Sequence, residues 1–285
     1  MIKTISNNNL TVQIDTYGAE LQSVKNSDGE EYLWSGDKSI WGRKAPVLFP
    51  ICGGLKGGKY TYNGKEYELI KHGFANVSEF ELVADEEARA EFLLKSNEQT
   101  KKSYPFDFEL RVSYEISGNT LKSRFSVKNL SEADMYFSLG AHESYSCPEG
   151  AENYAVIFDC DTSLERYDTD GGLLLDEPEI MEIPDKTINL CDSMFENDAL
   201  VFKNFKSRRI WLLNKATGKK ARLDFNGFDY LLIWKKPVGN YICLEPWTGL
   251  PDSVSSSGKI EEKEGITRLA AGKTYIVDHE IEYWN

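Results

Sequence analysis

Histidine and long apolar runs are both scarce in this chain. Three histidines occur among 285 residues, His72, His142 and His279, so each is a candidate worth following. No stretch approaches the roughly 18 apolar residues of a membrane span. The start, MIKTISNNNLTVQID, also lacks the apolar run of a secretory signal peptide. The sequence therefore predicts neither a membrane helix nor export.

Paired cysteines are lacking as well, and basic residues are outnumbered by acidic ones. The five cysteines, at 52, 147, 160, 191 and 243, are odd in number, with no CxxC pair and no metal-like spacing with histidine. Buried free thiols in a reducing cytoplasm are expected. Lys and Arg total 33 against 46 Asp and Glu, a net charge of −13. That charge repels phosphate backbones and anionic lipids, which argues against nucleic-acid and membrane partners.

Helical periodicity is nearly absent, and period-two alternation dominates instead. The stretch 106–116 alternates Phe, Leu, Val, Tyr and Ile with mostly polar residues, and the alternation resumes over 121–127 after a turn at 117–119. This pattern predicts a long antiparallel hairpin with one wet face. A second hairpin is predicted at KYTYNGKEYEL, where Asn63-Gly64 separates two aromatic-rich runs.

Further strands are expected along the whole chain. They are predicted at 10–15, 79–83, 91–95, 135–139, 155–159, 209–213, 221–225, 230–234, 241–244 and 275–283. No linker, repeat or composition shift divides the sequence, and 41% of its residues are hydrophobic, enough for a large core. We therefore predict a single all-β domain over residues 1–285, a sandwich or a barrel.

The three histidines differ in their surroundings. His279 alternates with apolar residues in TYIVDHEIEYW and is expected in the core or at its boundary. His72, in LIKHGFAN, follows a predicted strand and precedes Gly73, so it can project into a cleft. His142, in SLGAHESYSCP, lies where a strand gives way to a loop. A turn histidine bonded to a carbonyl and a functional histidine both fit that position.

Glu245 stands out among the acidic residues. It precedes Pro246 in ICLEPWTGLPDS, where a strand is expected to end, and Trp247 follows. A carboxylate at the mouth of an aromatic-lined pocket would have a raised pKa and act as a better base. Aromatic faces beside carboxylates are typical of sugar sites. Four tryptophans are candidates for stacking on a sugar, with core packing as the alternative: Trp34, Trp41, Trp234 and Trp247.

Four segments in a fixed order resemble one family. GAELQSV, KAPVLFPICGGLKGGKYTYNGKEYELIKHGFAN, SLGAHESYSCP and YICLEPWTGLPD are similar to the aldose 1-epimerase (galactose mutarotase) superfamily, nearest to its LacX-type branch. The resemblance runs from about Leu10 to the C-terminus. It implies a large β-sandwich of the supersandwich kind, in line with the strand pattern. It also implies interconversion of the α and β anomers of a free aldohexose such as galactose or glucose, without cofactor or metal.

The same resemblance implies residue roles. Glu245 matches the general base that takes the anomeric hydroxyl proton, and His142 matches the acid that protonates the ring oxygen. His72 matches a histidine that hydrogen-bonds the sugar, and Asp198, in ENDALVF, matches an aspartate that binds sugar hydroxyls. Trp247 is taken as a further substrate contact. A carboxylate with a raised pKa and an imidazole near neutrality can each transfer protons in both directions, which ring opening and closure require.

Two positions depart from the family pattern. Gly54 stands where an arginine usually binds the sugar, and Arg43 and Lys56 are the cations that could replace it, Arg43 being our choice. Glu143 follows His142 where the family usually has proline, and it either keeps the imidazole protonated or faces solvent. The chain shows no arginine cluster for a phosphate, which disfavours phosphorylated sugars. GGLKGG lacks both nucleotide-binding spacings, so no nucleotide is expected.

Two alternative functions stay open at this point. The protein could bind or sense a sugar without useful turnover, which the loss of the arginine would explain. It could instead be a glycoside hydrolase that uses Glu143 and Glu245 as its carboxylate pair. That mechanism requires the two carboxyl groups to face one another roughly 5–9.5 Å apart.

Overall fold

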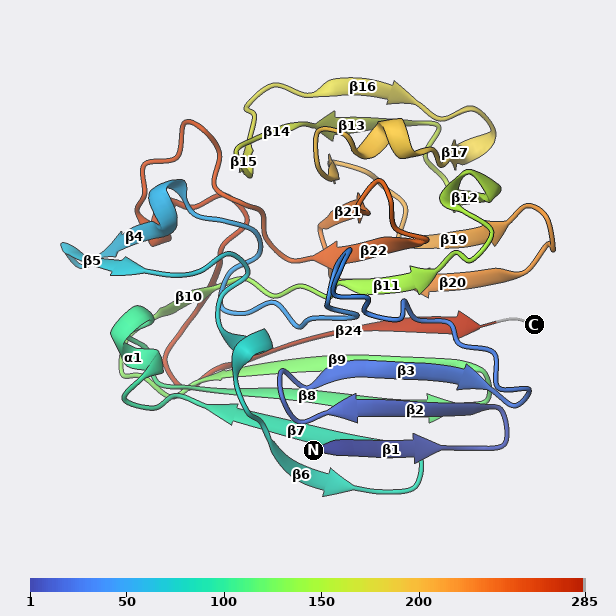
Figure 1. Ribbon diagram of the computed structural model, residues 1–285. Helices are drawn as coiled ribbons and strands as arrows, with labels where there is room; N and C mark the ends of the chain where they lie inside the picture. Colours follow the sequence, from blue (N-terminus) through green and yellow to red (C-terminus); the bar gives the residue numbers. More distant parts are fainter. Residues whose placement is uncertain (284–285) are drawn as a thin grey trace.

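Two large antiparallel sheets make up most of the molecule in a computed structural model that describes residues 1–283 (Figure 1). In spatial order, the nine-stranded sheet contains β17 (Thr187–Asn189), β12 (Tyr154–Phe158), β19 (Arg209–Asn214), β20 (Lys220–Asp224), β24 (Thr274–Tyr283), β9 (Thr120–Asn129), β8 (Phe108–Ser117), β7 (Arg89–Lys95) and β6 (Glu81–Asp85). The six-stranded sheet contains β11 (Glu143–Ser146), β22 (Tyr241–Trp247), β21 (Tyr230–Trp234), β18 (Leu200–Lys203), β13 (Ser163–Tyr167) and β16 (Glu179–Glu182). The predicted all-β architecture is confirmed.

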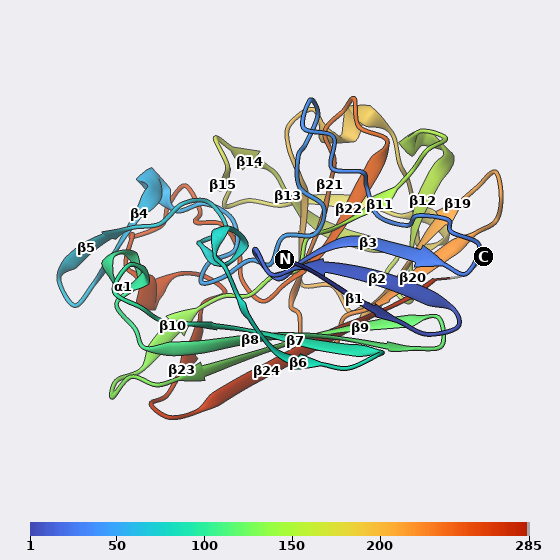
Figure 2. The same ribbon diagram turned by 60° about the horizontal axis from the view of Figure 1, so that its bottom comes forward.

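Smaller elements surround these sheets. A three-stranded sheet of β1 (Ile2–Ser6), β2 (Leu10–Asp15) and β3 (Glu20–Asn26) lies beside β7 and β8 in both ribbon views (Figures 1 and 2). Three two-stranded sheets are β4 (Lys59–Tyr62) with β5 (Lys65–Glu68), β10 (Met135–Phe137) with β23 (Thr267–Leu269), and β14 (Thr169–Asp170) with β15 (Leu173–Leu174). Helical segments are short: α1 (Thr100–Ser103) and the 3₁₀ turns η1 (Lys56–Gly58), η2 (Ala75–Val77), η3 (Ala151–Asn153), η4 (Pro184–Lys186), η5 (Asp192–Phe195) and η6 (Ile260–Glu262).

Both predicted hairpins form. Strands β8 and β9 pair in register from Phe108 opposite Asn129 to Ser117 opposite Thr120, and alternate residues are buried. The turn between β4 and β5 places Asn63 and Gly64 at φ values of 49° and 73°. Because both residues have positive φ, this turn matches the twist of its strands, which explains the Asn-Gly sequence.

Several strands lay outside the predictions because their sequences do not alternate. Strand β11, ESYS, is mostly buried although three of its four residues are polar, whereas β16, EIME, is mostly exposed. The predicted strand at 79–83 begins two residues later, since Glu79 instead forms an isolated bridge with Tyr17. Strand β22 continues through Pro246 to Trp247, contrary to the expected end at Glu245. Proline is tolerated there because β11 begins at Glu143, opposite Leu244, so Pro246 lies past the end of that ladder. The carbonyl of Pro246 still accepts a hydrogen bond from the Ala141 N–H at 3.1 Å.

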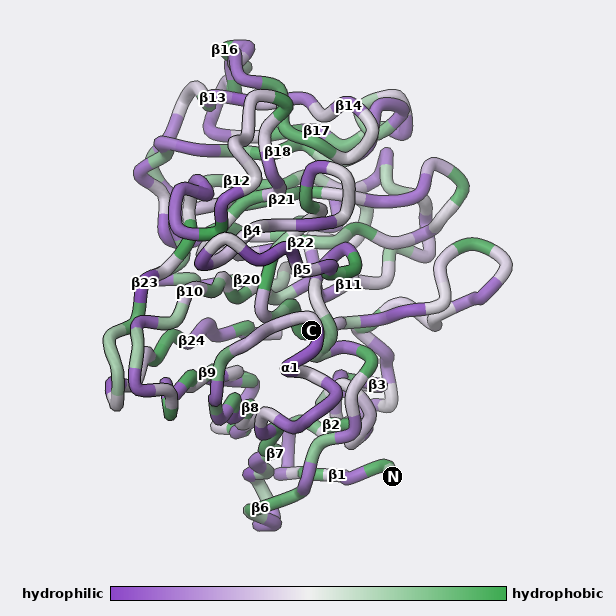
Figure 3. The backbone as a smooth tube through the Cα atoms, turned by 90° about the vertical axis from the view of Figure 1, so that its left-hand side faces the viewer, coloured by the Kyte–Doolittle hydropathy of each residue, from purple (hydrophilic) through white to green (hydrophobic). Residues whose placement is uncertain are grey.

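A continuous hydrophobic cluster joins the sheets. It includes Val12 of the three-stranded sheet, Phe92 and Val112 of the nine-stranded sheet, and Ile233 and Leu244 of the six-stranded sheet. The alternation of apolar and polar residues along the strands is visible in Figure 3. Burying each such side chain stabilises the fold by about 1.5–3 kcal/mol relative to exposure. The single domain expected for the whole chain stays a prediction.

The cysteines are all free thiols. Cys52, Cys147 and Cys243 are buried as expected, whereas Cys160 is exposed and Cys191 is partly exposed, so burial was wrong for these two. Among residues 1–283 no helix has the length and apolar character needed to cross a membrane.

Candidate active site

A cavity of about 410 Å³ opens beside the six-stranded sheet. All six residues that the sequence pointed to line it: Arg43, His72, His142, Asp198, Glu245 and Trp247. A larger hollow of about 660 Å³ lies over the polar face of β7, β8 and β9, but charged and hydroxyl side chains line it, with neither histidine nor aromatic rings. The chemistry-bearing groups therefore gather in the smaller cavity.

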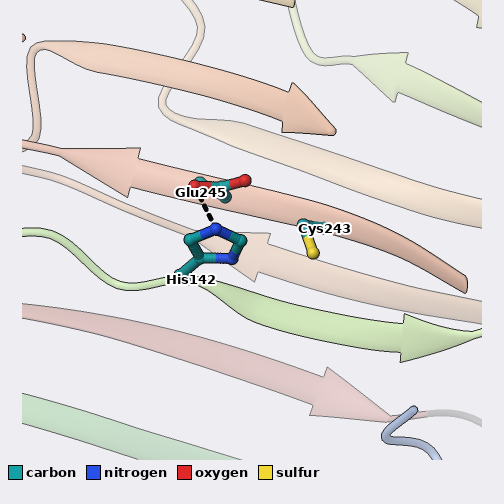
Figure 4. A group of neighbouring side chains, drawn as sticks. All are labelled: His142, Cys243 and Glu245. Atoms are coloured by element: carbon teal, nitrogen blue, oxygen red, sulfur yellow. Dashed lines mark ion pairs between the residues drawn. The ribbon is translucent and has the colours of Figure 1, made fainter. Parts of the chain in front are cut away.

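Sheet register brings His142 and Glu245 together. Glu143 of β11 pairs with Leu244 of β22 in an antiparallel ladder. His142, one residue before Glu143, therefore lies opposite Glu245, one residue after Leu244. Imidazole Nε2 and carboxylate Oε2 lie 3.3 Å apart, with the two side chains 9% and 2% exposed (Figure 4). The pair thus sits in a nearly dry site while still bordering the cavity.

Burial dominates the electrostatics of this pair. It raises the pKa of Glu245 well above its ordinary value, Asp198 adds to the rise, and Lys71 opposes it. Burial also lowers the pKa of His142 to about 3, helped by Lys71 and Arg43. Both shifts disfavour the charged forms of the two side chains. With a proton on the imidazole and none on the carboxyl, the two groups are an acid and a base side by side.

Aromatic rings fix the orientation of His142. The Trp41 ring stacks on the imidazole with centroids 5.1 Å apart, and the Trp234 ring meets it edge-on at 5.7 Å. Both tryptophans line the cavity, whereas Trp34 is buried and donates its Nε1–H to the Trp41 carbonyl. Stacking toward the cavity is therefore available to Trp41 and Trp234, and Trp34 packs in the core.

His72 occupies a strained backbone position that directs its ring. Its φ is 68° and that of Gly73 is 70°, where a Cβ would stand 2.3 Å from the Phe49 carbonyl oxygen, so residue 73 must be glycine. The Gly53 N–H donates to His72 Nδ1 at 3.1 Å, which leaves the ring proton on Nε2. Burial lowers the pKa of His72, with His142 and Lys71 adding to the effect. His72 is therefore a neutral hydrogen-bond donor.

Asp198 and Arg43 border the cavity from loops. Asp198 follows η5 with a φ of 85°, in the left-handed region that aspartate tolerates better than most residues. Arg43 donates to the Asn76 carbonyl at 2.7 Å and pairs with Glu20 at 3.0 Å. Lys56 does not line the cavity, and its ammonium donates to the Val254 carbonyl instead. Of the two cations considered for the missing arginine, Arg43 alone borders the site.

Trp247 forms part of the cavity floor and is 2% exposed. Its ring lies so close to Gly140 that a Cβ there would stand 2.6 Å from Trp247 Cδ1. Edge contacts link it to His72, with centroids 5.6 Å apart. Core packing thus accounts for most of this side chain, and only its rim borders the cavity.

Glu143 faces away from the cavity, which contradicts both expectations for it. Its Oε1 lies 2.8 Å from His279 Nε2, and these side chains are 4% and 0% exposed. Because successive strand residues point to opposite faces, Glu143 enters the core while its neighbour His142 enters the cavity. His279 is a core residue, as predicted. Glu143 and Glu245 therefore cannot flank one glycosidic bond, and the hydrolase alternative fails.

Sequence reasoning missed two lysines and one thiol. Lys71 and Lys236 line the cavity, and neither ammonium has an ion-pair partner within residues 1–283. Cys243 precedes Glu245 by two residues on the same face of β22. With His142 and Glu245 it forms a trio whose nitrogen, sulfur and oxygen donors all lie within 4.8 Å of one another and could hold a metal ion. The sequence spacing of these three residues does not indicate a metal site, because residue 142 is about 100 positions away from 243 and 245. Only the pairing of β11 with β22 brings them together.

Known proteins resemble this chain in both sequence and structure. The sequence model of the family described as Aldose 1-epimerase matches residues 1–255. "Protein LacX, plasmid" of Lactococcus lactis subsp. lactis is 34% identical over an alignment of 301 residues that covers 99% of both chains.

Two solved structures are similar over the whole chain. A galactose mutarotase related enzyme from Lactobacillus acidophilus has a TM-score of 0.94 at 36% identity, covering 100% of this chain and 98% of that one. A galactose mutarotase-like protein from Lactobacillus casei ATCC 334 has a TM-score of 0.92 at 28% identity, covering 100% of both chains. These neighbours confirm the galactose mutarotase-like β-sandwich.

Proposed function

Because this chain belongs to the aldose 1-epimerase family, we propose that it interconverts the α and β anomers of a free hexose, with Glu245 as base and His142 as acid. The observation that carries the proposal is the 3.3 Å contact between these two side chains at the wall of the cavity. No other acid–base pair at that cavity combines this proximity with such burial in the described residues.

The reaction needs one proton removed from O1 of the sugar and one delivered to the ring oxygen O5. With a proton on His142 and none on Glu245, Glu245 is a carboxylate that takes the proton from O1. His142 delivers its proton to the ring oxygen O5 as the C1–O5 bond breaks, giving the open-chain aldehyde. After rotation about C1–C2 the ring closes on the other face and both transfers reverse. Each positioned transfer contributes about 10²–10⁴-fold to the rate.

The rest of the cavity supplies groups that hold a sugar. His72 presents an Nε2–H donor, Asp198 an acceptor and Arg43 a fixed cation, and Trp41 and Trp234 offer aromatic faces. A volume of about 410 Å³ lies within the roughly 300–1,000 Å³ of small-molecule sites. The polar groups fix orientation, whereas the rings contribute apolar contact area.

The test is the relaxation of freshly dissolved α-D-glucose and α-D-galactose, followed by polarimetry or proton NMR. The wild-type protein is expected to accelerate relaxation, Glu245→Gln to abolish the acceleration, and His142→Asn to reduce it at least about 100-fold. Glu66→Gln, an exposed position remote from the cavity, is the matched control. A wild-type rate in Glu245→Gln refutes the mechanism. Sugar binding without acceleration by the wild-type protein supports the sugar-sensing alternative.

Lys71 and Lys236 favour a second candidate substrate, a phosphorylated hexose. Both lysines border the cavity without an ion-pair partner in the part of the chain that the structure describes, so they could neutralise a phosphate. The sequence showed no arginine cluster that could bind a phosphate, and the two lysines would take that role for a phosphorylated sugar. Comparing kcat/KM for a hexose and its 6-phosphate tests it: Lys236→Met should lower only the value for the phosphate, and equal losses for both sugars refute it.

A further inference from the structure

We propose that His142, Cys243 and Glu245 form a binding site for one thiophilic divalent cation of the Zn²⁺ kind, which blocks proton transfer by His142 and Glu245. The three donors come from two chain segments that strand pairing brings together, with Cys243 and Glu245 projecting from the same face of β22 (Figure 4). Metal binding is independent of the proposed function. Only the inhibition of mutarotation by the metal rests on the proposed function.

The donor set and its spacing suit such a cation. Zinc accepts imidazole nitrogen, thiolate sulfur and carboxylate oxygen at about 2.0–2.3 Å, which places tetrahedral donors roughly 3.3–3.6 Å apart. His142 Nε2 and Glu245 Oε2 already stand at 3.3 Å, and all three donors lie within 4.8 Å of one another. Because no two of the donors are more than 4.8 Å apart, reaching this spacing requires movements of at most about 1.5 Å, within the reach of side-chain rotations.

The charges balance when the metal is bound. A divalent cation with one thiolate, one carboxylate and one neutral imidazole has no net charge, so the buried site avoids the cost of an uncompensated ion. Binding displaces the thiol proton of Cys243, and any proton on Glu245, to solvent as the sulfur–metal and oxygen–metal bonds form. No electron transfer and no further reactant are involved.

The fourth coordination position faces the cavity. His142 and Glu245 both line it, whereas Cys243 lies behind them among Trp34 and Tyr241. Three protein ligands with one open position is the arrangement that leaves room for water or a hydroxyl group. A bound ion would occupy the carboxylate and imidazole that ring opening needs, which makes the site inhibitory.

The other cysteines offer a built-in comparison. Within residues 1–283 none of them belongs to a group of three potential ligands, and Cys160 is exposed with Ser207 as its neighbour. A metal held by surface thiols in general would therefore depend on Cys160 rather than on Cys243.

Titration with Cd²⁺ tests the site through the ultraviolet thiolate-to-cadmium charge-transfer band. One equivalent is expected to produce the band in the wild-type protein and in Cys160→Ser, and neither Cys243→Ser nor Cys243→Ala should show it. Two Cys243 variants are used in case one of them fails to fold, and thermal unfolding verifies which variants are folded. Absence of the band in the wild-type protein, or its persistence without Cys243, overturns the proposal.

Inhibition by Zn²⁺ gives a second readout. Apparent inhibition of mutarotation, scaled to each variant's own metal-free rate, should weaken at least about tenfold in Cys243→Ser, since even outer-shell partners are worth 10–100-fold. Unchanged inhibition in that variant contradicts the proposed ligand set. If the wild-type protein fails to accelerate mutarotation, the charge-transfer titration still decides the metal site.

Discussion

Removing the carboxylate of Glu143 should unfold the protein more easily without altering the chemistry in the cavity. Glu143 and His279 are 4% and 0% exposed and lie 2.8 Å apart, so neither has water as a substitute partner. Breaking a buried pair by deleting one member typically costs 3–5 kcal/mol, and this burial leaves no solvent screening to reduce that range. We therefore expect Glu143→Ala to lower the free energy of unfolding by about 3–5 kcal/mol.

Urea denaturation with the linear-extrapolation analysis measures this change. For a chain of this size the melting temperature should fall by roughly 2–4 °C per kcal/mol. Glu66→Ala, whose partner Lys59 is half exposed, is the control and should change the free energy by less than about 1 kcal/mol. Mutarotation by the folded fraction should persist, because the side chain points away from the cavity. Wild-type stability combined with lost activity would refute the reasoning and return Glu143 to the site.

Three further predictions concern residues in or near the cavity. Because the pKa of His142 falls to about 3 on folding, this residue binds more protons in the unfolded chain than in the folded one below about pH 6.5. The contribution of the neutral His142 to stability is then lost as the pH falls from about 6.5 to about 3, so His142→Asn should show a shallower loss than wild type in urea melts across that window. Equal pH profiles contradict the shift. Gly140→Ala places a Cβ 2.6 Å from Trp247 Cδ1, so it should cost about 1–3 kcal/mol and lower kcat/KM, whereas wild-type values would mean that the floor yields freely. Gly54→Arg should fold normally, since its Cβ would meet only the Gly172 carbonyl at 3.8 Å, and it should lower KM for the hexose; a raised KM would show that the arginine position is not vacant.

Much of the fold was predictable because its long strands are amphipathic. The hairpin of β8 and β9 buries every second residue, so apolar and polar residues alternate in its sequence. The Asn63-Gly64 turn is predictable from its two residues, because both favour the positive φ values that this turn requires. Short strands such as β11 were not predictable. Glu143 and Ser144 are buried by pairing with β22, and nothing in their local sequence distinguishes them from a polar loop.

The site divides in the same manner. The types of residue that perform the proposed chemistry, and the six positions that line the cavity, followed from sequence patterns and from resemblance to a family. The burial that shifts their pKa values did not, because it depends on rings such as Trp41 and Trp234 that come from distant segments.

By itself, the period-two alternation of the sequence predicted an all-β fold, because alternation along a strand is a local property. The resemblance to a family added the sandwich architecture and the candidate pair of His142 and Glu245. Only the tertiary structure decided which groups meet. Strand register set His142 against Glu245 and Cys243, and it turned Glu143 toward His279 in the core. The physical reason is that a shift of one residue along a strand exchanges its two faces, and cross-strand pairing over long separations makes that choice.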